Sequence, residues 1–398
     1  MVSLEQIGIL DFKSYNLKGK LFEREEDFKV QEIEEDGTVL NLERKEKREV
    51  TEEKKDYLLF TLVKRGISTP EAIKLIARNL HISFKRIAYN GNKDKRALTS
   101  QRISIFKFDA ENLSIDSERM FFRDLTYSND PCKIGKLYGN HFTVIVKEFD
   151  ASGDELNKIT QDINKGVPNF YGPQRFGSAS LNIETSKSIL IGDFKSAFYT
   201  LVLKERNESE INRERRAALR SVFSGYLENG NVNKEDVEKA LSALPYFMYF
   251  ERDSLSYLMQ HKNDYAGAIR LLPKYLRLMV LQSFQYYVFN KTLSIMLKDT
   301  SIEKLEKEIS TIGYDMDTES IEAKIAIGIL KEEGIEDIKK LKLSSMPEAS
   351  LKSFKHPSYF IPEGFNIGLN GNDAIISFNL KKGSYATILL LKLFGNAQ

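Results

Sequence analysis

A polar segment lies between two apolar ones in Ile87-Ala-Tyr-Asn-Gly-Asn-Lys-Asp-Lys-Arg-Ala-Leu-Thr-Ser-Gln-Arg-Ile-Ser-Ile-Phe106. The first apolar segment ends at Tyr89, and Asn90-Gly91 then gives a strong turn signal, because both residues tolerate a positive φ. The alternation from Gln101 to Phe106 predicts a half-buried strand. We therefore expect a loop between two strands, and this loop carries a single carboxylate, Asp94.

Three cations, Lys93, Lys95 and Arg96, surround Asp94 in the sequence. Nearby positive charges favour the ionised form of a carboxylate. We therefore expect Asp94 to be an anion at neutral pH, suited to act as a nucleophile rather than as a general acid. The alternative is a solvated loop whose charges only maintain solubility, and this stretch alone does not decide between the two.

Five motifs are spread from residue 26 to residue 387. They are Glu26-Asp-Phe-Lys-Val-Gln-Glu32, Gly91-Asn-Lys-Asp-Lys-Arg-Ala-Leu-Thr-Ser-Gln101, Gly139-Asn-His-Phe142, Val167-Pro-Asn-Phe-Tyr-Gly-Pro-Gln-Arg-Phe-Gly177 and Ile376-Ser-Phe-Asn-Leu-Lys-Lys-Gly-Ser-Tyr-Ala-Thr387. In type and in order they resemble the motifs of the TruD family of tRNA pseudouridine synthases, with an archaeal or eukaryotic-like character. Two positions depart from the family pattern. Lys381 replaces the proline of the last motif, and Phe22 stands where bacterial members often carry a lysine.

The resemblance implies an α+β fold. A pseudouridine-synthase-like catalytic domain with a mixed, mostly antiparallel sheet would be interrupted by a largely helical α+β insertion domain. We expect the catalytic domain in residues 1–177 and 351–398 and the insertion domain in residues 178–350. The implied activity is that of a tRNA pseudouridine(13) synthase, an intramolecular transferase that isomerises uridine, with Asp94 as the nucleophile and tRNA or another structured RNA as the partner.

The resemblance also implies that four residues lie on the side of the target base: Phe28, Asn140, Phe142 and Phe378. An amide can donate and accept hydrogen bonds at once, and aromatic faces stack on any base. The competing interpretations are structural. Phe28 and Phe378 could be core residues of their strands, and Asn140 could fix the backbone of its own turn.

Four cations are candidates for binding RNA phosphate or for supporting Asp94, namely Lys93, Lys95, Arg96 and Arg175. The guanidinium of Arg175 offers a fixed fork for phosphate or carboxylate oxygens. The sequence does not decide which of the two roles each cation has.

Length and composition indicate the number of domains and the cellular compartment. The chain has 398 residues, which suffices for two domains, and its hydrophobic fraction of 41% allows a packed core. The single cysteine, Cys132, favours a reducing compartment. No apolar run approaches the roughly 20 residues of a membrane helix, and no secretory signal is evident at the start, so we expect a cytoplasmic protein without a membrane partner.

Charge is distributed unevenly, although the net charge is only +2. Between residues 85 and 107 the sequence holds seven cations and one anion, a local charge of +7 − 1 = +6. Clustered cations bind RNA by releasing counterions. We therefore expect a positive field around Asp94, with a solvated charged face as the alternative for the outer lysines.

Hydrophobic patterning predicts the elements. We expect strands at 28–33, 57–63 and 137–146, and a solvated loop at 43–56. Ser68-Thr-Pro-Glu71 predicts the beginning of a helix that continues to about residue 80. Long helical patterns follow residue 178, among them one at 271–290, and 374–393 returns to strand character.

The sequence gives little support for metal-dependent chemistry or for the use of a nucleotide cofactor. The four histidines are widely separated and no paired cysteine accompanies them, so we expect no metal. No phosphate-binding loop or dinucleotide fingerprint occurs, so we expect no cofactor. Two alternatives remain open: a non-catalytic RNA-binding or tRNA-folding protein on the same fold, and a metal-dependent nuclease. The oligomeric state cannot be predicted.

Overall fold

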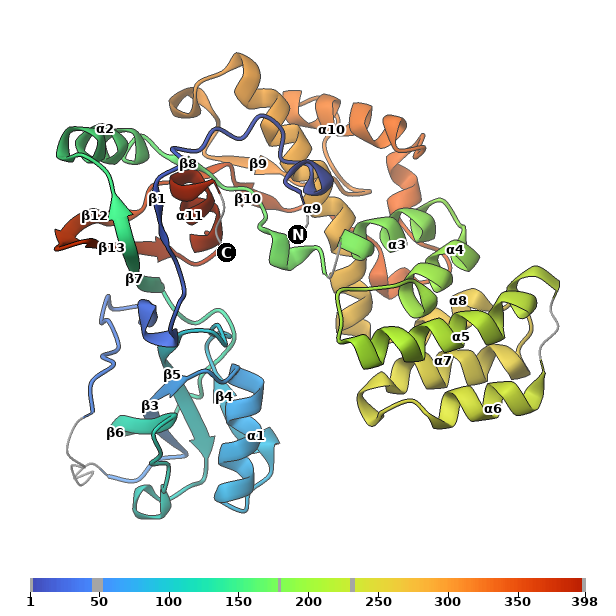
Figure 1. Ribbon diagram of the computed structural model, residues 1–398, viewed down its shortest axis with the longest axis horizontal. Helices are drawn as coiled ribbons and strands as arrows, with labels where there is room; N and C mark the ends of the chain where they lie inside the picture. The colour runs from blue at the N-terminus through green and yellow to red at the C-terminus, as the bar shows by residue number, and fades with distance from the viewer. Residues whose placement is uncertain (1–2, 45–52, 178–179, 230–232, 396–398) are drawn as a thin grey trace. The chain divides into compact units, whose positions relative to one another are not determined.

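A computed structural model describes residues 3–44, 53–177, 180–229 and 233–395. The chain divides into two compact units (Figure 1). One, the sheet unit, comprises residues 13–167 and 360–398, and the other, the helical unit, comprises residues 1–12 and 168–359. The chain passes from one unit to the other three times, between residues 12 and 13, within the short strand β8 (Val167–Pro168) and within the short strand β11 (Tyr359–Phe360).

The sheet unit is built on nine strands in the order β12-β13-β7-β2-β5-β3-β6, with β1 paired to β7 and β4 paired to β5. The strands are β1 (Lys18–Lys20), β2 (Phe28–Ile33), β3 (Tyr57–Arg65), β4 (Ile87–Tyr89), β5 (Leu98–Phe106), β6 (Met120–Ser128), β7 (Gly139–Asp150), β12 (Glu363–Asn370) and β13 (Asp373–Lys381). Every pair is antiparallel except β2 with β5. The expected strands are confirmed, and most of the expected loop at 43–56 lies outside the described residues.

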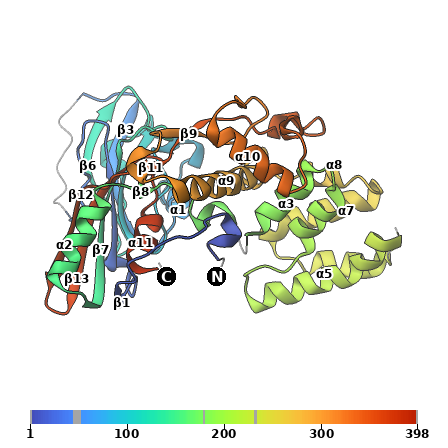
Figure 2. The same ribbon diagram turned by 90° about the horizontal axis from the view of Figure 1, so that it is seen from above.

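Helix α1 (Thr69–Asn79) begins as the sequence predicts. The Ser68 hydroxyl accepts a hydrogen bond from the Glu71 amide at 3.4 Å, and the Glu71 carboxylate accepts one from the Ser68 amide at 3.0 Å, which satisfies two free donors of the first turn. Ile73 and Ile76 are buried among apolar side chains of β3 and β5. The helix therefore covers one face of the sheet (Figures 1 and 2).

The end of the chain differs from the prediction of strand character through residue 393. Strand β13 ends at Lys381, a turn with Gly383 at φ +90° follows, and α11 (Ala386–Phe394) is a helix. The reason is that residues 388–391 form an unbroken apolar run rather than an alternation. Such a run is typical of a buried helix as much as of a buried strand.

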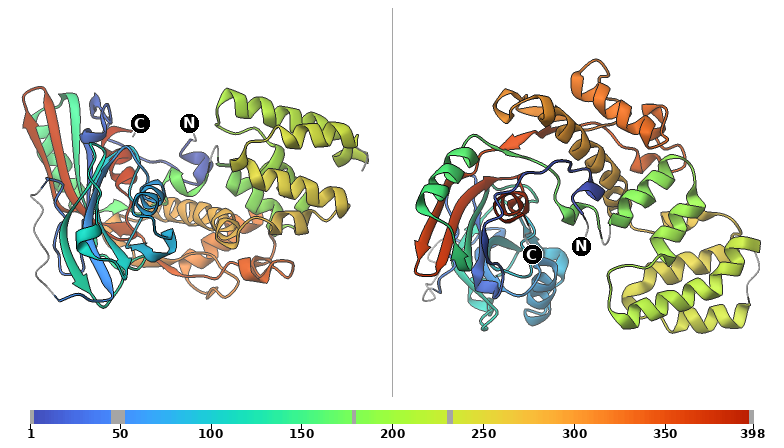
Figure 3. Two further views of the ribbon diagram at one scale, coloured as in Figure 1. Left: turned by 90° about the horizontal axis from the view of Figure 1, so that it is seen from below. Right: turned by 45° about the horizontal axis from the view of Figure 1, so that its top comes forward.

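The helical unit is organised around the long helix α9 (Lys274–Asp299), with α3 (Leu181–Leu190) and α10 (Ile321–Glu332) beside it (Figures 1 and 3). Its remaining helices are α4 (Phe194–Phe198), α5 (Glu210–Asn229), α6 (Lys234–Ser242), α7 (Tyr249–Gln260) and α8 (Tyr265–Arg270). A short antiparallel pair joins β9 (Glu308–Ser310) to β10 (Lys355–Pro357). The helix expected at 271–290 corresponds to α9.

The expectation of an α+β fold with a mixed, mostly antiparallel sheet is confirmed. The assignment of residues 1–177 and 351–398 to catalysis and of 178–350 to an insertion domain stays a prediction. Two of the divisions between the compact units, at residues 167/168 and 359/360, lie near those boundaries, and the third, at residues 12/13, lies far from them. None of the helices described here is both long and apolar enough to cross a membrane.

Candidate active site

Strand register places most of the candidate residues on one face of the sheet. Phe378 on β13 lies opposite Phe142 on β7, and Phe142 lies opposite Val30 on β2. Val30 pairs with Thr99 on β5, which pairs with Lys64 on β3. Because paired residues share a face and side chains alternate along a strand, the neighbours two positions away, Phe28, Glu32, Gln101 and Asn140, lie on this face as well.

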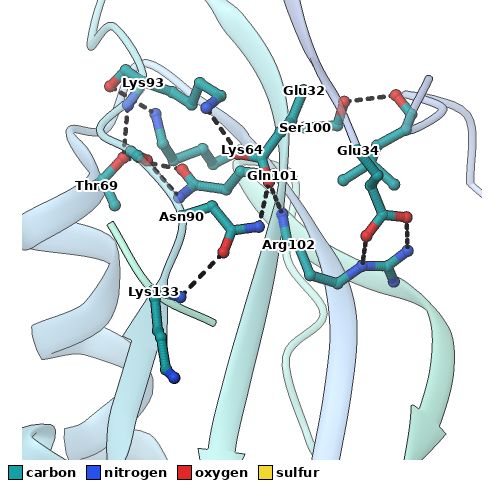
Figure 4. A network of polar contacts seen from close by, with 12 residues as sticks. Glu32, Glu34, Lys64, Thr69, Asn90, Lys93, Ser100, Gln101, Arg102 and Lys133 are labelled. Carbon is teal, nitrogen blue, oxygen red and sulfur yellow. Dashed lines mark hydrogen bonds and ion pairs between the residues drawn. The ribbon is translucent and has the colours of Figure 1, made fainter. Parts of the chain in front are cut away.

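Asp94 lies in the loop between β4 and β5. Side chains of the sheet face and of α1 hold the backbone of this loop, and Figure 4 shows those of Lys64, Thr69 and Gln101. The Thr69 hydroxyl accepts a hydrogen bond from the Lys93 amide at 2.9 Å and donates one to the Gln101 side chain at 2.8 Å. The Gln101 amide in turn donates to the Gly91 carbonyl at 3.2 Å. The Lys64 ammonium donates to the Asp94 carbonyl at 3.0 Å.

The side chain of Lys93 is buried and does not reach solvent. Its ammonium lies 2.7 Å from the Glu32 carboxylate, and the two side chains are 3% and 0% exposed. Glu32 also accepts hydrogen bonds from the Asn90 side chain at 2.9 Å and from the Arg102 amide at 3.3 Å (Figure 4). The motif residues Glu32 and Lys93 therefore form one buried ion pair next to Asp94 in the chain. This geometry fits a role of Lys93 in supporting Asp94 better than a role in binding RNA phosphate.

The expected positive field around Asp94 is weaker than the local count suggests. Glu32 pairs with Lys93, Glu34 pairs with Arg102, and Glu71 pairs with Lys95. These three glutamates come from parts of the chain outside the counted window. A net charge summed over a window of sequence therefore overstates the charge that folding leaves around the loop.

The cations near Asp94 act on its pKa in the expected direction, but the net shift of that pKa is upward. Asp94 is exposed to solvent, but surrounding protein displaces part of its water, and this desolvation raises its pKa. The charges of Lys64 and Lys93 act in the opposite direction without cancelling the rise. The carboxylate is therefore less fully hydrated and more basic than a free aspartate.

Two other candidate cations are exposed. Lys95 contacts Glu71 at 3.2 Å, and the guanidinium of Arg96 reaches the Phe22 carbonyl at 3.5 Å. Arg175 is exposed in a short 3₁₀ turn, Pro173–Arg175, of the helical unit, so the structure does not place it relative to Asp94. Its neighbours Phe170, Tyr171 and Phe176 are buried.

The three candidate phenylalanines are buried and stack on one another. Phe142 is the middle ring, with its centroid 5.1 Å from that of Phe378 and 6.0 Å from that of Phe28, and both interplanar angles are 20°. Phe22 meets Phe28 edge-on at 5.1 Å. The rings thus form a rigid aromatic row across β13, β7 and β2 rather than free stacking platforms, and only Phe22 at its end is partly exposed.

Asn140 is half-buried on the same face, beside Glu32 on the neighbouring strand. Its side-chain oxygen is buried and has no hydrogen-bond donor among the residues that the structure describes. A buried acceptor without a donor is costly. Among the candidate residues, Asn140 is therefore the one with an unsatisfied hydrogen-bond acceptor.

Sequence reasoning missed Lys64. This lysine is 1% exposed, and its ammonium contacts backbone carbonyls rather than a carboxylate. The signal was present, because Leu58, Phe60 and Leu62 alternate along the predicted strand as core residues and Lys64 continues that series on the same side.

Comparisons with known proteins agree with the motifs. The family model described as "tRNA pseudouridine synthase D (TruD)" matches residues 9–310. The chain is 30% identical to "Probable tRNA pseudouridine synthase D 1" of Methanococcus maripaludis over 85% of this chain and 93% of that one. It is 29% identical to "Probable tRNA pseudouridine synthase D" of Methanosarcina mazei over 97% and 96%. A crystal structure of a Methanosarcina mazei protein described as TruD superposes with a TM-score of 0.72 at 28% identity, covering 98% of this chain and 97% of that one.

The chain is accordingly an RNA-modifying isomerase of the pseudouridine synthase class. Within this class it belongs to the TruD family. The family and the class of enzyme predicted from the five motifs are thus confirmed.

Proposed function

We propose that this enzyme converts the uridine at position 13 of tRNA to pseudouridine, and that Asp94 is its nucleophile. The observation that carries the proposal is the exposed Asp94 carboxylate on a loop whose backbone is fixed by buried polar side chains. The names of the relatives support tRNA as the substrate.

The reaction requires one carboxylate and no oxidation or reduction. Isomerisation breaks the N1–C1′ glycosidic bond, turns the uracil and forms a C5–C1′ bond to the same sugar. C5 loses its proton and N1 gains one, so the composition of the nucleoside is unchanged. A carboxylate must therefore reach the sugar or the base of a nucleotide that has left its stack. The raised pKa of Asp94 favours this role, because a partly desolvated and more basic carboxylate is the better nucleophile.

The face of the sheet beside Asp94 would hold the extruded uridine. In this proposal the buried row of Phe28, Phe142 and Phe378 is the rigid apolar floor, and the unpaired oxygen of Asn140 accepts a hydrogen bond from an N–H of the uracil. Lys95 and Arg96 are the exposed cations of the loop and would contact phosphate.

Mapping pseudouridine in unmodified tRNA transcripts after incubation with the protein tests the proposal. We expect conversion at position 13, in RNA chains that stay intact and in the presence of EDTA. Binding without conversion would favour the non-catalytic RNA-binding alternative. Metal-dependent cleavage would favour the nuclease, and conversion at another position would refute the assignment of the target.

A further inference from the structure

Lys64 on β3 has an unusual environment for a charged side chain. It is buried, and among the described residues its ammonium forms no ion pair. The ammonium instead donates to three backbone carbonyls, those of Ile67 at 2.7 Å, Asp94 at 3.0 Å and Lys93 at 3.4 Å. An ammonium has three donors, so these contacts use its full capacity.

The three carbonyls belong to two separate segments. Ile67 immediately precedes the capping residue of α1, whereas Lys93 and Asp94 belong to the loop between β4 and β5. One side chain thus fastens the backbone of Asp94 to the beginning of α1. The Lys93 amide bonded to Thr69 makes a second link between the same two segments.

Removing the Lys64 ammonium from water costs free energy, and an apolar side chain at the same position would not have this cost. Desolvation lowers the pKa of Lys64 to about 8. The charged groups that act on it are Asp94, which favours the ammonium, Lys93, which opposes it, and Glu71 on α1, which favours it. A lysine held in this place contributes what an apolar residue cannot, namely three donors for the loop backbone and a positive charge beside Asp94.

We infer that Lys64 is a positioning residue for catalysis, which fixes the backbone of Asp94 and stabilises its carboxylate, and whose deprotonation ends activity at high pH. This inference rests on the proposed role of Asp94. In this inference the protonated Lys64 positions the Asp94 carboxylate through a hydrogen bond to the Asp94 backbone, and Lys64 does not contact the substrate.

Steady-state kinetics with tRNA test the inference in Lys64→Met, which keeps the length of the side chain and removes its charge and its donors. We expect kcat to fall by about 100-fold, the loss typical of a reacting group displaced by about 1 Å, with KM for tRNA unchanged. Lys74→Met is the matched control, because Lys74 is an exposed lysine on α1 outside the site. An unchanged kcat in Lys64→Met would overturn the inference.

The pH profile gives a readout that a merely structural role would not move. Wild-type activity should decline as the pH rises through about 8, where the Lys64 ammonium loses its proton. Lys64→Arg keeps its charge far above that pH, so its residual activity should not decline there. The same decline in both proteins would overturn the inference.

Hydrogen exchange separates this inference from the proposed function, because it needs no activity. We expect the backbone amides of residues 91–96 to exchange faster in Lys64→Met than in the wild type and in Lys74→Met, even if no pseudouridine forms. Unchanged exchange in that segment would refute the positioning role. Absence of product from the wild type would instead refute the proposed function alone.

Discussion

Removal of the Glu32 carboxylate is expected to destabilise the sheet unit strongly. The change Glu32→Gln keeps the shape and leaves the Lys93 ammonium, now 2.7 Å from a neutral amide, buried without its counter-charge. Breaking a buried ion pair from one side costs about 3–5 kcal/mol. This is a large part of the 5–15 kcal/mol by which a typical domain is stable.

Cys132 offers a local assay for this loss, because it is the only cysteine of the chain and is buried in the same unit. Labelling of its thiol requires opening of the unit. Since 1.4 kcal/mol corresponds to a factor of ten, we expect labelling in Glu32→Gln to accelerate by roughly 100- to 4,000-fold.

Two comparisons make this result specific. The double variant Glu32→Gln/Lys93→Met should label more slowly than Glu32→Gln, because no unpaired charge remains buried. Lys20→Met breaks an ion pair with Glu148 that is exposed in the same unit, and it should label at the wild-type rate. A wild-type labelling rate in Glu32→Gln would refute the reasoning that the buried pair supports the Asp94 loop.

Two further predictions concern the same unit. Gly139→Ala should abolish soluble folded protein or greatly lower the unfolding midpoint in urea, because a Cβ at this position would lie 2.0 Å from the Leu380 carbonyl oxygen. Gly153→Ala is the control, since a Cβ there meets nothing within 4 Å, and it should leave the midpoint unchanged or higher. Equal midpoints in the two variants would contradict the argument. Wild-type Cys132 should resist alkylation by iodoacetamide at pH 8 until urea unfolds the protein, because burial raises the pKa of its thiol to about 12. Rapid alkylation of the native protein, detected by mass spectrometry, would contradict this prediction.

Local signals in the sequence predicted several elements correctly. Ser68, Pro70 and Glu71 mark the beginning of α1 by interactions within one turn of helix, so no other part of the chain is needed to infer it. The loop of Asp94 follows in the same way from Asn90-Gly91 and the strands on either side.

Other features depend on contacts between distant segments and could not be predicted in this way. The buried pair of Glu32 and Lys93 joins β2 to the β4–β5 loop, and it neutralises a cation that a count over neighbouring residues treats as free. The stacking of Phe28 on Phe142 requires the register between β2 and β7. Helix α11 replaces the expected strand, and the sequence could not distinguish the two because an unbroken apolar run has no diagnostic period.

The central claim, that Asp94 performs the chemistry, is tested most directly by measuring pseudouridine formation and tRNA binding in one preparation of Asp94→Asn. The change keeps the shape of the side chain and removes the nucleophilic oxygen anion. We predict no pseudouridine above the background of the assay, with tRNA affinity close to that of the wild type. Pseudouridine formation at a rate near that of the wild type would contradict the claim.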